Sequence, residues 1–210
     1  MIFTKKDQTT LNKIITSRRD VRGNNFINKK ISQKKLLKIL DSAQNAPSVG
    51  YSQPWRFVIV NKKKKDLVYK HFKKSFNKSK KKFKSRRIYN SLKLEGIKES
   101  YINIAVYYKK SKKDILGQTY MKRTGEYSVV CAILNMWLTA RALNIGMGWV
   151  SILKPRKINK IFDMKKEDYK FIAYLCFGYT KEFFDEPELK KLGWKKKKKI
   201  KDLILKKGKK

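Results

Sequence analysis

The stretch EYSVVCAILNMWLTARALNIG, residues 126–146, limits what this chain can fold into more than any other part of its sequence. About twenty residues are apolar nearly all the way round a helix, which is typical of a helix buried at the centre of a domain. Asn135 and the polar ends argue against a membrane span, which needs about 18 uninterrupted apolar residues. Gly146 is expected to end the helix as a C-terminal glycine. The rest of the chain should therefore pack around a central helix.

Further helices are predicted on both sides of this segment. Their expected positions are residues 5–17, 31–48, 63 to about 98, and a short helix opened by Pro155. In the first helix, Leu11, Ile14 and Ile15 are expected to face inward. Ser32 is placed to cap the second helix, and Pro47 to end it.

Short apolar runs rich in β-branched and aromatic residues alternate with these helices. They predict strands at residues 55–61, 101–108, from Met147 onward, and 171–179. Residues 109–125 are expected to form a loop with Gly117 and Gly125 as breakers. The alternation predicts one domain over residues 1–210, with α/β or α+β layers around a mixed sheet.

The last thirty residues, about 180–210, look like an extended arm with no core pattern of their own. An arm of this kind usually packs on another surface. A second copy of the chain is the simplest partner, so a homodimer is expected.

The formal net charge of +39 suggests a polyanionic partner or an anionic membrane surface. However, lysines occur in every segment, and no zinc-finger spacing, aromatic RNA-binding pattern or basic region running into heptads is present. The lysine runs at 195–199 and 206–210 are expected to contact polyanions only weakly. No specific nucleic acid and no membrane is therefore expected as a partner.

The opening residues MIFTKKDQTT show no secretory pattern, which favours a cytoplasmic location. Cys131 and Cys176 lie inside apolar runs, as expected for small buried side chains in a reducing compartment. A disulfide or a catalytic thiol is the alternative for these two cysteines.

Residues 17–24, SRRDVRGN, place Arg18, Arg19 and Arg22 around one carboxylate, that of Asp20. The rest of the chain mostly uses lysine, whereas arginine presents a planar fork that binds two oxygens of a phosphate or carboxylate at once. The cluster therefore indicates an anion held by directed hydrogen bonds. The alternative is a solvated turn in which Asp20 only pairs with its neighbours.

Two further segments are candidates for ligand contact. In APSVGYSQPWRF, residues 46–57, Ser48 and Gln53 offer polar groups where a stiff loop enters a strand. In IGMGWVSI, residues 145–152, the glycine pair would bring bare backbone close to a flat ligand, with the Ser151 hydroxyl nearby. The glycines precede a strand, so they are not a dinucleotide-binding fingerprint. Each segment has a plain turn as its alternative.

Metal-binding and covalent machinery is not evident in the sequence. With His71 as the single histidine, neither a histidine-based metal site nor a Ser-His-Asp arrangement is expected. The KLEG segment, residues 93–96, is expected to be a helical surface patch. Any redox or difficult carbon chemistry would therefore come from a bound organic cofactor.

Several of these motifs together carry a resemblance to a known family. RRDVR followed by a helix, then APSVGYSQPWRFVIV, resembles the opening of the nitroreductase-fold flavoproteins. Within them the chain is most similar to the BluB branch, the 5,6-dimethylbenzimidazole synthases, because Asp20 stands where ordinary nitroreductases carry a small hydroxyl residue. SLKLEGI at 91–97, the segment 126–153, and YLCFGY with EPELKKLGW also match that branch in order and spacing. The resemblance covers roughly residues 12–203.

The resemblance implies an α+β nitroreductase-like fold: a central mixed or antiparallel sheet flanked by helices, with an extended C-terminal arm. It also implies a homodimer with FMN at the interface. In the implied reaction, reduced FMN is the substrate and is fragmented with molecular oxygen, after a separate NAD(P)H-linked flavin reductase has supplied it. The products are 5,6-dimethylbenzimidazole, the lower ligand base of cobalamin, and a sugar phosphate.

The resemblance further implies which residues form the site. Asp20 matches the acid characteristic of this branch, and Ser151 the hydroxyl that accompanies it. The three arginines match positions that hold the phosphate and ribityl end of FMN. The implied flavin-contacting set is Arg18, Arg19, Asp20, Val21, Arg22, Pro47, Ser48, Gln53, Leu94, Gly148, Trp149 and Ser151.

Two other functions are alternatives to this one. The first is an NAD(P)H-dependent nitroreductase or flavin reductase that keeps FMN as a prosthetic group, and the combination of Asp20 with Ser151 argues against it. The second is a basic nucleic-acid-binding protein, which predicts binding that collapses as the salt concentration rises.

Overall fold

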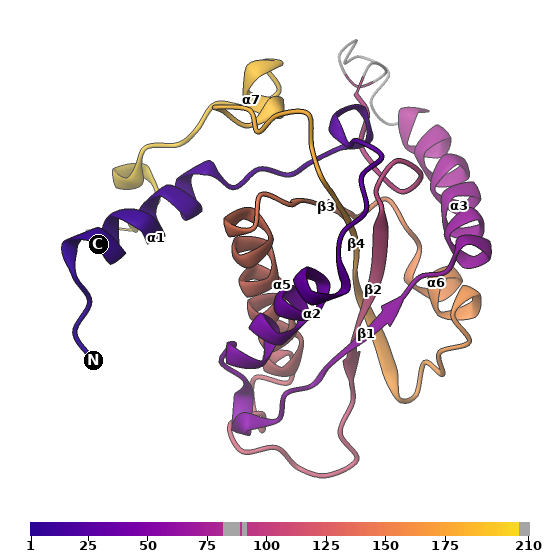
Figure 1. Ribbon diagram of the computed structural model, residues 1–210. Helices are drawn as coiled ribbons and strands as arrows, with labels where there is room; N and C mark the ends of the chain where they lie inside the picture. The colour runs from indigo at the N-terminus through magenta and orange to yellow at the C-terminus, as the bar shows by residue number, and fades with distance from the viewer. Residues whose placement is uncertain (82–88, 90–91, 206–210) are drawn as a thin grey trace, which may run out of the picture.

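The structure is a computed structural model that describes residues 1–81, 89 and 92–205. Its centre is a four-stranded antiparallel sheet with the strand order β1-β2-β4-β3 (Figure 1). The strands are β1 (Trp55–Ile59), β2 (Ile102–Lys109), β3 (Gly146–Val150) and β4 (Tyr169–Gly178). All four predicted strands are confirmed. The parallel pairing found in the described residues is a single bridge between Asp20 and Met147.

Helices cover both faces of this sheet (Figure 1). One face carries α2 (Gln33–Ser42) and α5 (Thr124–Ala142), and the other carries α3 (Lys62–Lys80) and α6 (Pro155–Ile161). Two helices lie away from this sandwich, α1 (Lys5–Ser17) and the short α7 (Glu188–Lys191). Single 3₁₀ turns occur at Gly23–Asn25, Ala43–Asn45, Val49–Tyr51 and Ile200–Asp202. The α+β class and the flanked antiparallel sheet are thus as the resemblance implied.

The two central strands, β2 and β4, are buried on both faces because a hydrophobic core lies on each side of the sheet. On the α5 side, Ile104, Ile133 and Met136 are among the residues with no exposed surface. On the α3 side, Val68 and Ile158 are equally buried. Cys176 is also fully buried, whereas Cys131 is half-buried, and both are free thiols.

Helix α5 is buried on one side only, which corrects the expectation of a helix surrounded by the domain. Its inner face packs against the sheet, but its outer face exposes Tyr127 by 49%, Val130 by 43% and Leu134 by 49%. These side chains recur every three or four residues and form one apolar stripe. In α1, Leu11 and Ile15 are likewise exposed, contrary to their predicted inward orientation.

Two glycines differ from their predicted roles. Gly146 does not end α5 but begins β3, and the left-handed residue after the helix is Asn144, with φ of 55°. Gly125 is not a loop breaker but the second residue of α5, where a Cβ would collide with the ring of Tyr108. Asparagine tolerates the left-handed region better than most residues, which explains the first difference.

The helix predicted from residue 63 to about 98 is confirmed up to Lys80, whereas residues 92–98 are not helical. Helix α3 ends at Lys80, and residues 82–88 and 90–91, with the start of SLKLEGI, lie outside the described residues. The KLEG segment is irregular rather than helical, and Glu95 is buried with its carboxylate 2.9 Å from Lys93 Nζ. Its prediction as a surface patch is therefore wrong.

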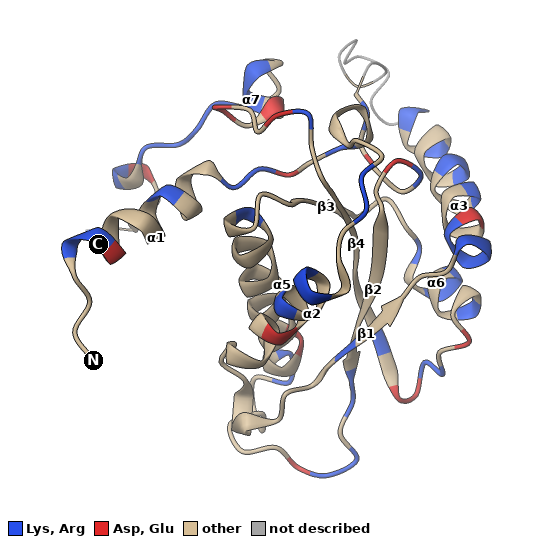
Figure 2. Cartoon of the chain, viewed as in Figure 1, with Lys and Arg blue, Asp and Glu red and all other residues tan. Residues whose placement is uncertain are grey.

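Basic residues are spread over the molecule, as Figure 2 shows, with dense runs along α3, α6 and the C-terminal segment. The described part of that segment, residues 181–205, contains no buried residue, which confirms an arm without its own core. None of the helices in the described ranges is long and apolar enough to cross a bilayer.

Candidate functional site

Asp20 lies against the outer edge of β3, directly after α1. The Val21 N–H donates to the Met147 carbonyl over 3.0 Å, and the Trp149 N–H donates to Asp20 Oδ1 over 3.0 Å. The backbone of β3 therefore fixes the carboxylate as well as the chain that carries it. Since β3 is an edge strand, the segment that carries Asp20 and Val21 lies along the outer edge of the sheet.

The surroundings of Asp20 act on its protonation in opposite directions. Desolvation by surrounding residues of the same chain raises the pKa of Asp20 above the ordinary value, although 41% of the side-chain surface is still open to solvent. The Trp149 N–H and the charges of Arg22 and Arg18 lower the pKa, but the effect of desolvation is larger. The raised pKa makes the protonated form of this carboxyl group easier to reach than that of an ordinary surface aspartate.

Gly148 allows the chain around Asp20 to lie this close to β3. A Cβ at Gly148 would collide with the Val21 carbonyl oxygen, and one at Gly146 would collide with Thr180. The glycine pair was expected to bring bare backbone close to a flat ligand. Within one chain, the side of Gly148 that lacks a Cβ faces Val21 instead.

Ser151 follows the end of β3 and is exposed. It is two residues beyond Trp149, hence at most about 7 Å further along the chain than the N–H that holds Asp20. It lines a cavity of 340 Å³ together with Ser75 and Lys78 of α3. The structure thus brings Asp20 and Ser151 to the same end of the same strand.

The three arginines of the cluster have different surroundings. The Arg18 guanidinium stacks on the Trp137 ring, 4.5 Å from its centroid, and makes no hydrogen bond to the described residues. Arg19 donates to the carbonyls of Thr16 (2.7 Å), Arg18 and Asp185. The donors of Arg18 are therefore not used by the described residues, whereas those of Arg19 bind backbone carbonyls.

Arg22 is nearly buried between two carboxylates. Its side chain is 9% exposed, with Nε 3.6 Å from Asp20 Oδ2 and Nη1 3.1 Å from Glu188 Oε2. Glu188 belongs to α7 in the arm, and the sequence predictions did not assign it a role. Its motif, EPELKKLGW, was part of the resemblance, but nothing local connects it to Arg22.

The segment after Arg22 leads to the KLEG region. The Gly23 N–H donates to the Glu95 carbonyl over 2.8 Å, which places the half-buried Leu94 close to the arginine cluster. Leu94 was in the predicted set, and it packs in the core on the α3 side.

The loop with Ser48 and Gln53 is held in a strained shape. Ser48 Oγ accepts from the Gln53 N–H over 3.2 Å, while Gly50, Tyr51 and Gln53 all have left-handed backbones, with φ of 54°, 49° and 42°. Such strain in non-glycine residues is often found at ligand sites. Pro47, at the start of this loop, is exposed.

This loop and the arginine cluster lie at opposite ends of α5. The Val49 N–H donates to Ser128 Oγ over 3.1 Å near the start of the helix. Near its end, Trp137 Nε1 donates to the Arg19 carbonyl and Arg141 Nε to the Ser17 carbonyl, both over 3.2 Å. At 1.5 Å per residue these points are about 14–20 Å apart. One chain therefore does not bring Ser48 and Gln53 together with Asp20.

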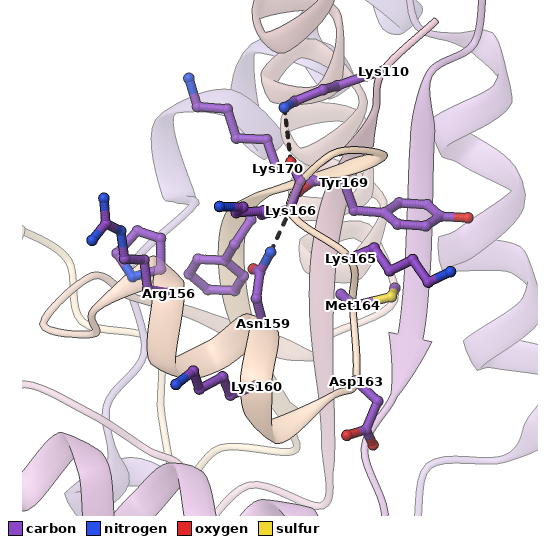
Figure 3. A pocket seen from close by; sticks show the side chains of 12 residues that line it. Lys110, Arg156, Asn159, Lys160, Asp163, Met164, Lys165, Lys166, Tyr169 and Lys170 are labelled. Carbon is purple, nitrogen blue, oxygen red and sulfur yellow. Dashed lines mark hydrogen bonds between the residues drawn. The ribbon is translucent and has the colours of Figure 1, made fainter. Parts of the chain in front are cut away.

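A large cavity among the described residues lies elsewhere (Figure 3). It measures 800 Å³ between α6 and the start of β4, and lysines such as Lys110, Lys160 and Lys170 surround it. Tyr169 in its wall is six residues along β4 from the partner of Trp149, which corresponds to about 20 Å. No residue of the predicted site lines this cavity, so we do not take it as the functional site.

The single histidine has a structural contact. His71 Nε2 accepts a hydrogen bond from the Lys154 N–H over 2.9 Å, which ties α3 to the start of α6. In the described ranges, no group of three or more His, Cys, Asp or Glu residues is arranged to hold a metal ion.

Comparison with known proteins adds a family and named relatives. The Nitroreductase family profile matches residues 15–179. The chain is 37% identical over 198 residues to a 5,6-dimethylbenzimidazole synthase of Rhodospirillum rubrum, covering 92% of each chain. It is 30% identical over 202 residues to a protein of the same name from Rhodobacter capsulatus, covering 92% of this chain and 95% of the other.

Solved structures share the fold at lower sequence identity. A BluB-like flavoprotein from Clostridium difficile superposes with a TM-score of 0.69 at 18% identity, covering 94% of this chain and 99% of that one. A Desulfovibrio desulfuricans protein described as a nitroreductase, solved in complex with FMN, has a TM-score of 0.69 at 17% identity, with 94% and 96% coverage.

Proposed function

The chain belongs to the nitroreductase family, and on that premise we propose that it is a 5,6-dimethylbenzimidazole synthase. Its substrate would be reduced FMN, which is fragmented with molecular oxygen to 5,6-dimethylbenzimidazole and a sugar phosphate. The observation that carries the proposal is the Asp20 carboxylate, held by the Trp149 N–H of β3, the strand that Ser151 follows in sequence. Two relatives of that name, at 37% and 30% identity over most of the chain, support it.

The residues around Asp20 fit a bound flavin nucleotide. Arg18 has a guanidinium without hydrogen-bond partners among the described residues, next to an aromatic ring, which suits a phosphate. The Trp149 side chain, half-buried near Trp137, offers a flat apolar surface at the edge of β3. Arg19 and Arg22 are held by protein groups, so we assign the phosphate contact chiefly to Arg18.

Asp20 and Ser151 have separate tasks in this proposal. Reduced FMN, when bound, would supply the electrons for the reduction of oxygen. Asp20, with its raised pKa, takes up and returns protons at the ring as its bonds are broken. The Ser151 hydroxyl donates or accepts a hydrogen bond at the same end of β3.

The complete site needs two chains. The Ser48–Gln53 loop lies about 14–20 Å from the arginine cluster along α5, and the outer face of α5 is apolar and exposed. We therefore propose a homodimer in which the loop of one chain meets the Asp20 region of the other, with FMN between them. Reduced flavin would come from a separate NAD(P)H-linked reductase in the cytoplasm.

The proposal is tested by product analysis. The protein is incubated with FMN, NADPH, a flavin reductase and air, and the mixture is searched for 5,6-dimethylbenzimidazole by mass spectrometry. We expect product in proportion to enzyme. Finding only peroxide and intact FMN at every enzyme concentration would overturn the proposal and favour the nitroreductase or flavin reductase alternative.

Asp20→Asn separates catalysis from binding. The amide oxygen still accepts from the Trp149 N–H, so flavin affinity should stay close to that of the wild type. Product formation should fall by about 100-fold or more, because the amide cannot transfer protons. Asp41→Asn, an exposed aspartate on α2, is the matched control and should retain full activity. Normal turnover by Asp20→Asn would show that the acid lies elsewhere.

A further inference from the structure

Arg22 connects the candidate acid to the C-terminal arm. Its buried guanidinium lies between Asp20, 3.6 Å from Nε, and Glu188, 3.1 Å from Nη1. The contact with Glu188 is an ion pair rather than a well-aligned hydrogen bond, since Nη1 has no hydrogen-bond partner in the described residues. A cation that is this buried needs its counter-charges close by. Both carboxylates are therefore part of the arrangement that keeps Arg22 in place.

The arm that carries Glu188 is fastened to the segment that carries Asp20. The Lys181 N–H donates to the Asn25 carbonyl over 2.9 Å, and Asn25 Nδ2 donates to the Glu182 carbonyl over 2.8 Å. Further along, an Arg19 nitrogen donates to the Asp185 carbonyl. Arg141 also stacks on Phe183, 4.0 Å from its centroid. These contacts hold the arm against the Asp20 segment and so place the Glu188 carboxylate next to Arg22.

The charges that act on Asp20 can be identified from each element around it. Its own segment supplies Arg18 and Arg22, β3 supplies the Trp149 N–H, and α7 supplies Glu188 through Arg22. Arg19 is directed to backbone carbonyls. Other charged groups near this segment, among the described residues, are Glu186 and Arg141, whose charges interact with that of Arg19, and Lys93, which pairs with Glu95 and Glu99 beside Gly23.

We infer that Glu188 is a positioning residue for Asp20: by holding Arg22 it limits how strongly that guanidinium stabilises the Asp20 carboxylate. The inference rests on the proposed function for the role of Asp20, but its electrostatic part concerns the protein alone. Without Glu188, the full charge of Arg22 acts on Asp20, and its carboxylate becomes easier to form. Docking of the arm thus keeps the acid available for proton transfer.

The test replaces Glu188 and observes Asp20 directly. In Glu188→Gln, the titration of the Asp20 carboxyl, followed by carbon NMR and assigned with Asp20→Asn, should move to lower pH by about one unit. Glu186→Gln is the matched control, because Glu186 lies two residues away and pairs with Lys190 at 2.6 Å instead of Arg22. It should leave the titration unchanged. A Glu188→Gln variant that folds and titrates like the wild type would overturn the inference.

A double-mutant cycle covers the case in which Glu188→Gln destabilises the arm. If Glu188 acts through Arg22, its replacement should shift the titration much less in an Arg22→Gln background than in the wild type. Glu188→Asp keeps the charge and should restore most of the wild-type titration. Equal shifts in both backgrounds would contradict an action through Arg22.

Activity measurements separate this inference from the proposed function. In Glu188→Gln, the limb of the pH–activity profile that reports Asp20 should move to lower pH in step with the NMR titration, while flavin affinity changes little. A purely structural role would lower flavin affinity without moving that limb. A shifted titration in an enzyme that makes no dimethylbenzimidazole would leave the inference standing and remove the proposed function.

Discussion

At the scale of single residues, the three arginines next to Asp20 show how one residue type serves three purposes. Arg18 lies on an aromatic ring and keeps its hydrogen-bonding groups free of described partners. Arg19 binds carbonyls of α1 and of the arm, and Arg22 is nearly buried between carboxylates. The planar guanidinium suits each use, because it stacks on a ring, offers several donors to carbonyls and reaches two carboxylates at once. This explains why arginine occurs here in a chain that otherwise favours lysine.

Arg18→Ala is expected to weaken flavin binding more than any other change in the cluster. Loss of charge-assisted hydrogen bonds to a phosphate costs about 1.5–3 kcal/mol, or about 10- to 150-fold in affinity. Arg19→Ala should have a smaller effect on flavin and should instead loosen the arm, measured by limited proteolysis. Fluorescence titration with FMN reports affinity, and Arg156→Ala, on the opposite face of the sheet, is the control. Equal affinities for Arg18→Ala and Arg156→Ala would refute the phosphate assignment.

The sequence predicted the near neighbours of Asp20 but not the distant ones. Arg18, Arg22 and Ser151 could be named because local pattern and resemblance both mark them. Glu188 could not, because its ion pair with Arg22 forms only when a distant arm folds back over the site. Trp137 was hidden in the same way, since its apolar surroundings predict a core residue and not a platform for Arg18.

At the scale of elements, α3 and α6 meet through the single histidine. His71 Nε2 accepts from the Lys154 N–H, the residue that precedes α6, so the imidazole must be neutral at that nitrogen. Desolvation lowers the pKa of His71, and the charges of Lys157, Lys154 and Lys74 lower it further. The neutral form is therefore favoured in the folded protein.

This pairing makes the stability of the fold depend on pH. Because the folded pKa lies below the ordinary value, the contribution of His71 is fully present above pH 6.5 and is lost as the pH falls through the folded pKa. The loss should amount to about 1 kcal/mol, the usual contribution of one hydrogen bond. Urea unfolding at pH 7.5 and pH 5 measures it against His71→Gln, which should lack this component. A constant difference between the two proteins across that range would exclude the histidine as its source.

The boundaries of helices and strands were predicted least well at glycines, because a glycine can either end an element or allow a close contact within it. Gly146 and Gly125 both suggested interruptions, but close packing requires them, against Thr180 and Tyr108 respectively. The turn after α5 uses Asn144 instead. A sequence pattern marks that a side chain is missing, but only the tertiary structure shows which neighbour takes its place.

At the scale of the whole molecule, the proposed homodimer would account both for the exposed apolar stripe on α5 and for the distance between the site segments. Leu134 lies midway along α5 between Ser128, which binds the Ser48 loop, and Arg141, which binds the Arg18 region. If two α5 helices pack antiparallel about this point, the loop of each chain meets the arginine cluster of the other. The sequence predicted a dimer from the arm and from the family resemblance. It misjudged the outer face of α5 because an apolar pattern does not show whether a face is covered by the chain's own domain or left exposed.

Leu134→Glu is therefore expected to break both the dimer and the flavin site. A charge forced into an apolar interface costs about 3 kcal/mol or more, so the variant should be monomeric at micromolar concentration by light scattering or sedimentation. Its affinity for FMN should fall at least about tenfold, because Ser48 and Arg18 then no longer reach the same ligand. Leu67→Glu, an exposed leucine on α3 across the sheet, is the control and should stay dimeric with normal affinity. If the Leu134→Glu variant is monomeric and binds flavin as tightly as the wild type, one chain holds the whole site. That result would exclude the two-chain site even if the wild-type protein is a dimer.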